Sequence, residues 1–171
     1  ALFMASLFDL SPSLKEISIL DPGAGSGILT AALVQRIIDI DKIKEIKITC
    51  YETNDDILEL LNKNLSWIKD NSPLKIEYKV LKDNYITSQT LEYNDMLGAC
   101  IKPEKYDLII GNPPYLKIGR MAEEALAMQD ICYGAPNLYF LFMEMASFNL
   151  VDSGELVFII PRSWTSGAYF R

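Results

Sequence analysis

The residues best suited to do chemistry stand together in the segment Asn112-Pro113-Pro114-Tyr115, directly after the apolar run 106–111. The Asn112 side-chain oxygen and the Pro113 carbonyl oxygen can both accept a hydrogen bond from one exocyclic amino group. The two prolines hold this turn rigid, because each fixes φ and lacks an N–H. Tyr115 adds a flat aromatic face on which a planar group can stack. The segment therefore predicts a site for a planar substrate that carries an amino group, with an unpaired nucleobase as the leading candidate.

A glycine-rich segment, residues 21–27 (DPGAGSG), follows another short apolar run. Its alternating glycines let the backbone turn sharply and approach a ligand without interference from Cβ atoms. The segment lacks the Lys and the G-x-G-x-x-G spacing of nucleotide phosphate sites, and its first residue is acidic, which would repel pyrophosphate and attract a cation. From this segment we expect cofactor contacts by Asp21, Pro22, Gly23, Gly25 and Ser26.

Acidic residues also follow the next two predicted strands: Glu52, before Thr53, and Asp83, before Asn84. We expect cofactor contacts by all four of these residues. At these positions Glu52 is suited to accept from ribose hydroxyls and Asp83 from an adenine amino group. Ligands of open parallel sheets bind outside the carboxyl ends of the strands, so these side chains should converge with Asp21 and Asn112 on one crevice. A ligand with an adenine, a ribose and a cationic amino-acid tail is S-adenosylmethionine, which is the expected cofactor.

The hydrophobic pattern alternates between strand and helix types along the chain. Strands are predicted at residues 17–20, 46–51, 75–81, 106–110 and 155–160, and helices at 28–38, 55–68 and 138–150. This alternation predicts an α/β fold with a doubly wound, mostly parallel sheet. Two stretches break the rhythm: 84–105 is expected to be a surface connection with a helical turn, and 116–136 a long loop with a short helix at 123–130.

The 171 residues include no histidine and three widely spaced cysteines, Cys50, Cys100 and Cys132. The length suits one domain. The lack of histidine excludes His-ligated metals and Ser-His catalysis, and we expect no metal site. The cysteine usage fits a reducing cytoplasm, where we expect the protein to act. No apolar run approaches the roughly 18 residues that span a bilayer, so no membrane partner is expected.

The net charge of −7 bears on the expected partner. Binding to nucleic acid normally requires basic groups that replace the counterions of the phosphates. This chain should therefore bind DNA weakly by itself, and we expect a basic region elsewhere.

These motifs resemble those of the adenine-N6 DNA methyltransferases of restriction–modification systems, across nearly all 171 residues. Residues 21–27 are similar to the glycine-rich motif of that family, Glu52 and Asp83 to its acidic cofactor positions, and residues 112–115 to its catalytic motif. Residues 4–8 (MASLF) resemble the end of its N-terminal cofactor motif, and 154–164 (GELVFIIPRSW) the strand that follows catalysis.

The resemblance implies a Rossmann-like sheet of the class I methyltransferase type. It also implies that residues 1–171 are a truncated catalytic domain, with the last two strands and a C-terminal target-recognition domain missing. The implied substrate is a flipped-out adenine in double-stranded DNA, bound through the missing recognition region, and the implied partner is a fused or separate restriction nuclease. An aromatic residue should cover the second face of the base; Phe170 is the first candidate and Tyr169 the next.

Alternatives remain open at this level. A protein glutamine-N5 methyltransferase shares the Asn-Pro-Pro-Tyr turn, an RNA amino-methyltransferase is a second enzyme alternative, and cytosine-N4 methylation is chemically close. A non-catalytic binding subunit is disfavoured because the motifs are intact. A nuclease is rejected for this segment: residues 45–47 and 77–79 match only the Glu-x-Lys end of a nuclease motif, without the upstream Pro-Asp.

Overall fold

The five strands found among the described residues pair in parallel in a single sheet. The structure, a computed structural model, describes residues 1–10, 15–94, 103–132 and 134–162. The strands are β1 (Glu16–Asp21), β2 (Glu45–Tyr51), β3 (Lys75–Leu81), β4 (Tyr106–Gly111) and β5 (Leu150–Phe158). Their order is β3-β2-β1-β4-β5, and every neighbouring pair is parallel. This confirms the predicted α/β, doubly wound fold. The strand order changes direction between β1 and β4, the position where such sheets bind ligands.

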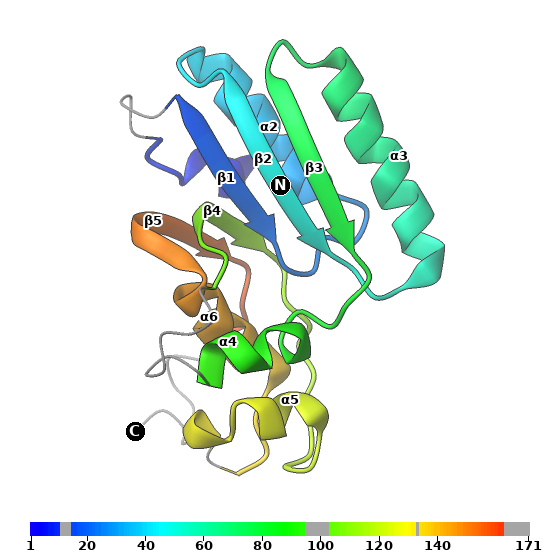
Figure 1. The fold of residues 1–171 in the computed structure, drawn as a ribbon, viewed down its shortest axis with the longest axis vertical. Helices are drawn as coiled ribbons and strands as arrows, with labels where there is room; N and C mark the ends of the chain where they lie inside the picture. Colours follow the sequence, from blue (N-terminus) through cyan, green and yellow to red (C-terminus); the bar gives the residue numbers. More distant parts are fainter. Residues whose placement is uncertain (11–14, 95–102, 133, 163–171) are drawn as a thin grey trace.

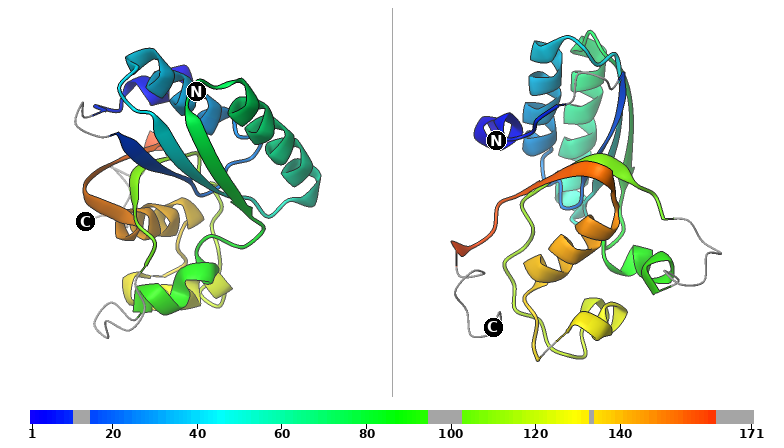
Figure 2. Two further views of the ribbon diagram at one scale, coloured as in Figure 1. Left: turned by 45° about the horizontal axis from the view of Figure 1, so that its top comes forward. Right: turned by 90° about the vertical axis from the view of Figure 1, so that its left-hand side faces the viewer.

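The helices are divided between the two faces of the sheet (Figure 1). The longer ones are α2 (Ile28–Ile40), α3 (Asp55–Asn71) and α6 (Leu138–Phe148), and the shorter ones are α1 (Leu2–Ser6), α4 (Thr90–Asn94) and α5 (Glu123–Ala127). Helices α1, α2 and α3 lie on one side of the sheet, and α5 and α6 lie together away from them (Figure 2). Two short 3-10 helices, Thr87–Gln89 and Gln129–Ile131, lie before α4 and after α5.

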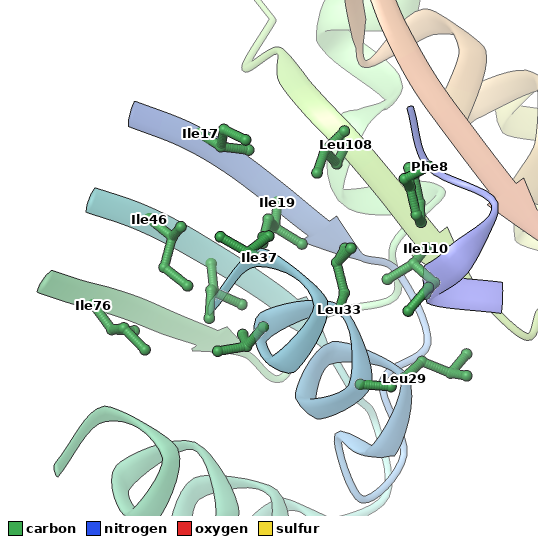
Figure 3. Packing of buried hydrophobic residues seen from close by; sticks show 14 of the residues in the cluster. Phe8, Ile17, Ile19, Leu29, Leu33, Ile37, Ile46, Ile76, Leu108 and Ile110 are labelled. Atoms are coloured by element: carbon green, nitrogen blue, oxygen red, sulfur yellow. The ribbon is translucent and has the colours of Figure 1, made fainter. Parts of the chain in front are cut away.

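Alternation along the strands builds a separate core on each face, because successive side chains of a strand point in opposite directions. On β1, Ile19 belongs to the core under α2, and the next residue, Leu20, belongs to the core under α6. Figure 3 shows Leu33 and Ile37 of α2 directed at the isoleucines of β1 and β2. Both faces of the central strands are therefore buried, which accounts for their nearly continuous apolar sequences.

The stretch 84–105 was predicted to be a surface connection with a helical turn. The helical turn is present, as the first 3-10 helix and α4, but part of the described stretch is buried and does not lie at the surface. Tyr85 is only 2% exposed and Ile86 is fully buried, both in the core under α6. The Tyr85 hydroxyl donates to Asn149 Oδ1 at 2.8 Å, and Asn149 Nδ2 donates to Gln89 Oε1 at 2.7 Å. This buried polar network ties the segment to the end of α6, an interaction that periodicity in a short segment does not reveal.

The other boundaries follow the predictions closely. The helix predicted at 138–150 ends at Phe148, and the strand predicted at 155–160 is longer at its start, beginning at Leu150. The extra strand residues follow from pairing, since Leu150 lies opposite Tyr106 before an irregularity in the β4–β5 register. The short helix predicted at 123–130 is present as α5, followed by the second 3-10 helix. Among the described residues, no helix is long and apolar enough to cross a membrane.

Adjacent leucines on α3 offer a matched test of this core. Leu61 is fully buried against the sheet, and Leu60 is 48% exposed. Leu61→Ala should lower the free energy of unfolding in urea by about 2–5 kcal/mol, because it leaves a cavity. Leu60→Ala should lower it by less than about 1 kcal/mol. Equal losses for the two variants would contradict the placement of α3.

Candidate active site

A cleft of about 390 Å³ opens at the carboxyl ends of the strands, within the range of small-molecule sites. Eight of the residues predicted from the sequence line it: Pro22, Gly23, Glu52, Thr53, Asp83, Asn84, Asn112 and Pro114. The lining also includes Tyr51, Tyr85, Glu124, Leu138 and Phe142, and it contains no Lys, Arg or His. The predicted convergence of cofactor residues with the catalytic turn is therefore present, in an acidic cleft.

Glu52 holds the glycine-rich loop against the end of β2. Its Oε2 accepts from the Gly25 backbone N–H at 2.9 Å, and its Oε1 accepts from the Asn54 N–H at 2.8 Å. A backbone bond from Ala24 to the carbonyl of Tyr51, at 2.9 Å, makes a second connection. Each carboxylate oxygen keeps a lone pair for a ligand hydroxyl, so Glu52 can fix the loop and bind a ribose together.

The loop enters α2 through a position that requires glycine. Gly27 has φ +81°, a left-handed conformation, and a Cβ there would lie 2.9 Å from Leu61 Cδ1. Both the backbone conformation and the close approach of α3 therefore exclude a side chain at this residue. Gly25, with φ +54°, is left-handed as well and faces open space.

Asp21 lies behind the loop and does not line the cleft. It is fully buried, and its Oδ2 accepts from the Thr30 hydroxyl at 2.8 Å. Its Oδ1 has no hydrogen-bond partner among the described residues. Burial raises the pKa of this carboxyl from 3.8 to about 7, although the Thr30 hydroxyl opposes the shift. The sequence suggested a carboxylate in contact with the ligand; in the structure its charge can act only through the loop. Gly25, Ser26, Pro113 and Tyr115 also lie outside the lining residues.

Asn84 joins the loop after β3 to α5. Its Oδ1 accepts from the backbone N–H of Ile86 at 3.0 Å and of Thr87 at 3.3 Å, which fixes the orientation of the side chain. Its Nδ2 donates to Glu124 Oε1 at 2.8 Å. A residue 40 positions later in the chain is thereby held beside Asp83 in the cleft.

The Asn-Pro-Pro-Tyr turn is fixed at the end of β4 by the neighbouring strand. Ile159 donates its N–H to the Gly111 carbonyl at 3.1 Å, and a Cβ on Gly111 would lie 2.8 Å from Phe158 Cε1. The Tyr115 hydroxyl oxygen lies 2.8 Å from Asn112 Oδ1 and 2.7 Å from the Ile159 carbonyl oxygen. Because a hydroxyl has one proton, it donates to one of these acceptors at a time.

The ring of Tyr115 is half exposed, and its edge-to-face contact with Tyr139 has a centroid distance of 6.1 Å. One face is thus accessible beside the Asn112 carboxamide. The proposed second aromatic, Phe170, and its neighbour Tyr169 lie outside the described residues.

Sequence reasoning missed the aromatic wall of the cleft. Tyr85 lies between Tyr51 and Phe142, at centroid distances of 5.1 and 5.3 Å. The run 138–148, rich in Phe and Met, gave the only signal, and its helical spacing is equally typical of a core helix. Glu124 was missed because nothing local distinguishes it from the adjacent Glu123.

The chain is similar in sequence to curated type II methyltransferases. It is 36% identical over 175 residues to M.PstI of Providencia stuartii, covering 98% of the chain and 32% of that protein. It is 31% identical over 172 residues to M.BsuBI of Bacillus subtilis, covering 100% of the chain and 34% of that protein. The chain thus spans about a third of the length of these relatives.

Relatives with other named substrates match a smaller share of the chain. A tRNA1(Val) (adenine(37)-N6)-methyltransferase of Shewanella woodyi is 31% identical over 151 residues, covering 88% of the chain and 55% of that protein. A release factor glutamine methyltransferase of Fusobacterium nucleatum is 28% identical over 160 residues, covering 88% of the chain and 39% of that protein.

The fold is shared with solved methyltransferases. A Listeria monocytogenes protein described as a class I S-adenosylmethionine-dependent methyltransferase superimposes with a TM-score of 0.68 at 17% identity, covering 99% of the chain and 45% of that protein. This confirms the class I methyltransferase fold. The family model of the Eco57I restriction-modification methylases matches residues 27–171. The chain belongs to the Eco57I restriction-modification methylase family.

Proposed function

We propose that the chain carries the catalytic site of an enzyme that methylates the N6 amino group of adenine in double-stranded DNA, as part of a restriction–modification system. The observation that supports this most is the single cleft that joins the carboxylates after β2 and β3 to Asn112 of the catalytic turn. The proposal includes a cytoplasmic location, target recognition by sequence outside this chain, and a restriction nuclease, fused or separate, as the partner.

S-adenosylmethionine is the cofactor, as expected from the residues and in agreement with the family and its fold. The donor groups of this molecule fit the cleft: its ribose hydroxyls can donate to Glu52 and its exocyclic amino group to Asp83. The charge of Asp21, buried behind the loop, attracts its ammonium from a distance. A lining without Lys or Arg suits a cation and would not hold a pyrophosphate. When bound, the cofactor supplies an electrophilic methyl group on a sulfonium.

The catalytic turn prepares the acceptor nitrogen. Adenine N6 is a poor nucleophile because its lone pair is delocalised into the ring. Asn112 Oδ1 and the Pro113 carbonyl each accept a hydrogen bond from one of the two N–H groups of N6. These hydrogen bonds favour a tetrahedral nitrogen with an available lone pair. When the amino group donates to Asn112 Oδ1, the Tyr115 hydroxyl can donate to its other acceptor, the Ile159 carbonyl. Asn112 Oδ1 is already held by the Tyr115 hydroxyl before the substrate arrives, so little reorganisation of this acceptor is needed.

Tyr115 contacts Asn112 of the turn through its hydroxyl and offers its ring for stacking on the base. N6 is unreachable inside a duplex, so the base must be flipped out of the helix. The accessible Tyr115 face, 49% exposed with its neighbours in place, can stack on the flipped base. It also lies near the positive charge that develops on the base, a contribution of about 0.5–2 kcal/mol. By the resemblance, Phe170 would cover the second face.

The alternative is a protein glutamine-N5 or an RNA amino-methyltransferase, because the turn accepts any planar amino group and relatives with those names exist. DNA is favoured by the family match and by the two type II relatives, which cover nearly the whole chain. Cytosine-N4 stays a second acceptor within DNA. The identity of the modified base decides among all of these.

Asn112→Ala should reduce kcat for methyl transfer to DNA by at least about 100-fold, because one of two fixed acceptors is lost. Cofactor affinity should change little. The assay is transfer of a labelled methyl group by the full-length protein, with the modified base identified by mass spectrometry. Asn62→Ala, an exposed asparagine on α3, is the control. Label found only in RNA or in a protein glutamine would contradict the DNA proposal.

Asp21 gives a prediction in which stability and binding change in opposite directions. Its folded pKa, about 7, lies above its ordinary value of 3.8, so the folded protein keeps a proton that the unfolded chain loses. The free energy of unfolding should therefore fall as pH rises from about 4 to about 7, and level off above. Asp21→Asn should flatten this fall and add about 1–4 kcal/mol at pH 8.

The same Asp21→Asn variant should bind S-adenosylmethionine more weakly at pH 8, since the buried negative charge is lost. Urea unfolding against pH and calorimetric titration measure the two effects. Asp39→Asn, an exposed aspartate on α2, should keep the wild-type behaviour in both. A variant that is both more stable and equally tight in binding would show that Asp21 has no role toward the cofactor.

A further inference from the structure

Glu124 occupies a position in the cleft to which the proposed function assigns no role. It lies on α5, between the catalytic turn and α6, and it lines the same cleft as Asp83 and Asn84. The lining contains three carboxylates, Glu52, Asp83 and Glu124. Glu52 binds the loop and is expected to bind the ribose, and Asp83 is expected to bind the adenine amino group. Glu124, the third carboxylate, therefore has no assigned ligand atom.

The structure fixes the orientation of Glu124 through Asn84. Because Asn84 Oδ1 already accepts from two backbone N–H groups, only its Nδ2 can face α5, where it donates to Glu124 Oε1 at 2.8 Å. Glu124 Oε2 makes no hydrogen bond with the described part of the chain. Within the described part of the chain, the carboxylate therefore keeps one oxygen without a partner beside the residue that follows Asp83.

The chemistry of an exocyclic amino group matches this arrangement. Such a group has two N–H donors, and a single carboxylate that approaches from one side satisfies only one of them well. A second acceptor, held at the adenine end of the cleft by Asn84, satisfies the other. A 6-oxopurine has an acceptor at the same place, which two carboxylates repel.

We infer that Glu124 is a specificity residue of the cofactor site: it accepts the second N–H of the adenine amino group and selects adenine over 6-oxopurines. This rests on the proposed function, in which the cleft binds S-adenosylmethionine. Asn84 is then a positioning residue that acts through Glu124. The contact also links α5, a few residues after the catalytic turn, to the adenine end of the cofactor.

The test is calorimetric binding of two ligands to the full chain, S-adenosylhomocysteine and S-inosylhomocysteine, which differ at the 6-position of the purine. Glu124→Gln keeps the size of the side chain and an oxygen for Asn84 Nδ2, and it places an N–H where an acceptor stood. Its Kd for S-adenosylhomocysteine should rise about tenfold or more. The ratio of the two Kd values should move toward one by a similar factor, because the amide can donate to a 6-oxo group.

Glu123→Gln, the adjacent exposed residue on α5, is the matched control and should keep both Kd values. If the Gln variant does not fold, Glu124→Asp takes its place. It retains the charge on a shorter side chain and should also lose part of the preference for adenine. Thermal unfolding without ligand reports folding for each variant.

A purely structural role of Glu124 predicts equal weakening of binding for both ligands. An unchanged ratio of the two Kd values would overturn the inference while the cofactor assignment stands. If the folded wild-type chain binds neither ligand, the proposed function and this inference fail together.

Discussion

Parallel pairing of five strands, with a change in the direction of strand order between β1 and β4, is the constraint on which the rest of the structure depends. Parallel strands all end at the same edge of the sheet, so whatever follows each strand meets at that edge. The glycine-rich loop follows β1, Glu52 follows β2, Asp83 follows β3 and the catalytic turn follows β4. Segments that are far apart in the sequence, from the glycine-rich loop to the catalytic turn, therefore line the same cleft.

Hydrogen bonds to backbone groups hold several segments in place at this edge. Glu52 binds two backbone N–H groups, Asn84 binds two more, and β5 fixes the start of the catalytic turn through Gly111. Asp21 is the exception, because its carboxyl has a raised pKa and an oxygen without a hydrogen-bond partner among the described residues. Such a group destabilises the folded chain near neutral pH. Such a group is typical of a functional site, where local stability is lost in exchange for binding.

The sequence predicted the parts of the molecule that depend on local pattern. The strands around Ile19, Ile48 and Ile109 were recognisable from apolar runs, and the motifs after them from residue types at strand ends. The part that depends on distant contacts was not predictable. Tyr85 is buried because Asn149, 64 positions later, accepts from its hydroxyl, and Glu124 enters the cleft because Asn84 holds it. The buried position of Asp21 behind its loop was likewise not predictable, because its hydrogen-bond donor is Thr30 of α2 and not a residue beside it in the sequence.

The proposed function requires the cleft at the end of β1, β2 and β3 to hold the cofactor with its reactive end toward Asn112. A crystal structure of the chain with S-adenosylhomocysteine would show whether it does. We expect ligand density with the ribose hydroxyls at Glu52, the adenine amino group at Asp83 and the sulfur end nearest the Asn-Pro-Pro-Tyr turn. Density at another surface, or a ligand in the cleft with its adenine directed at Asn112, would contradict it.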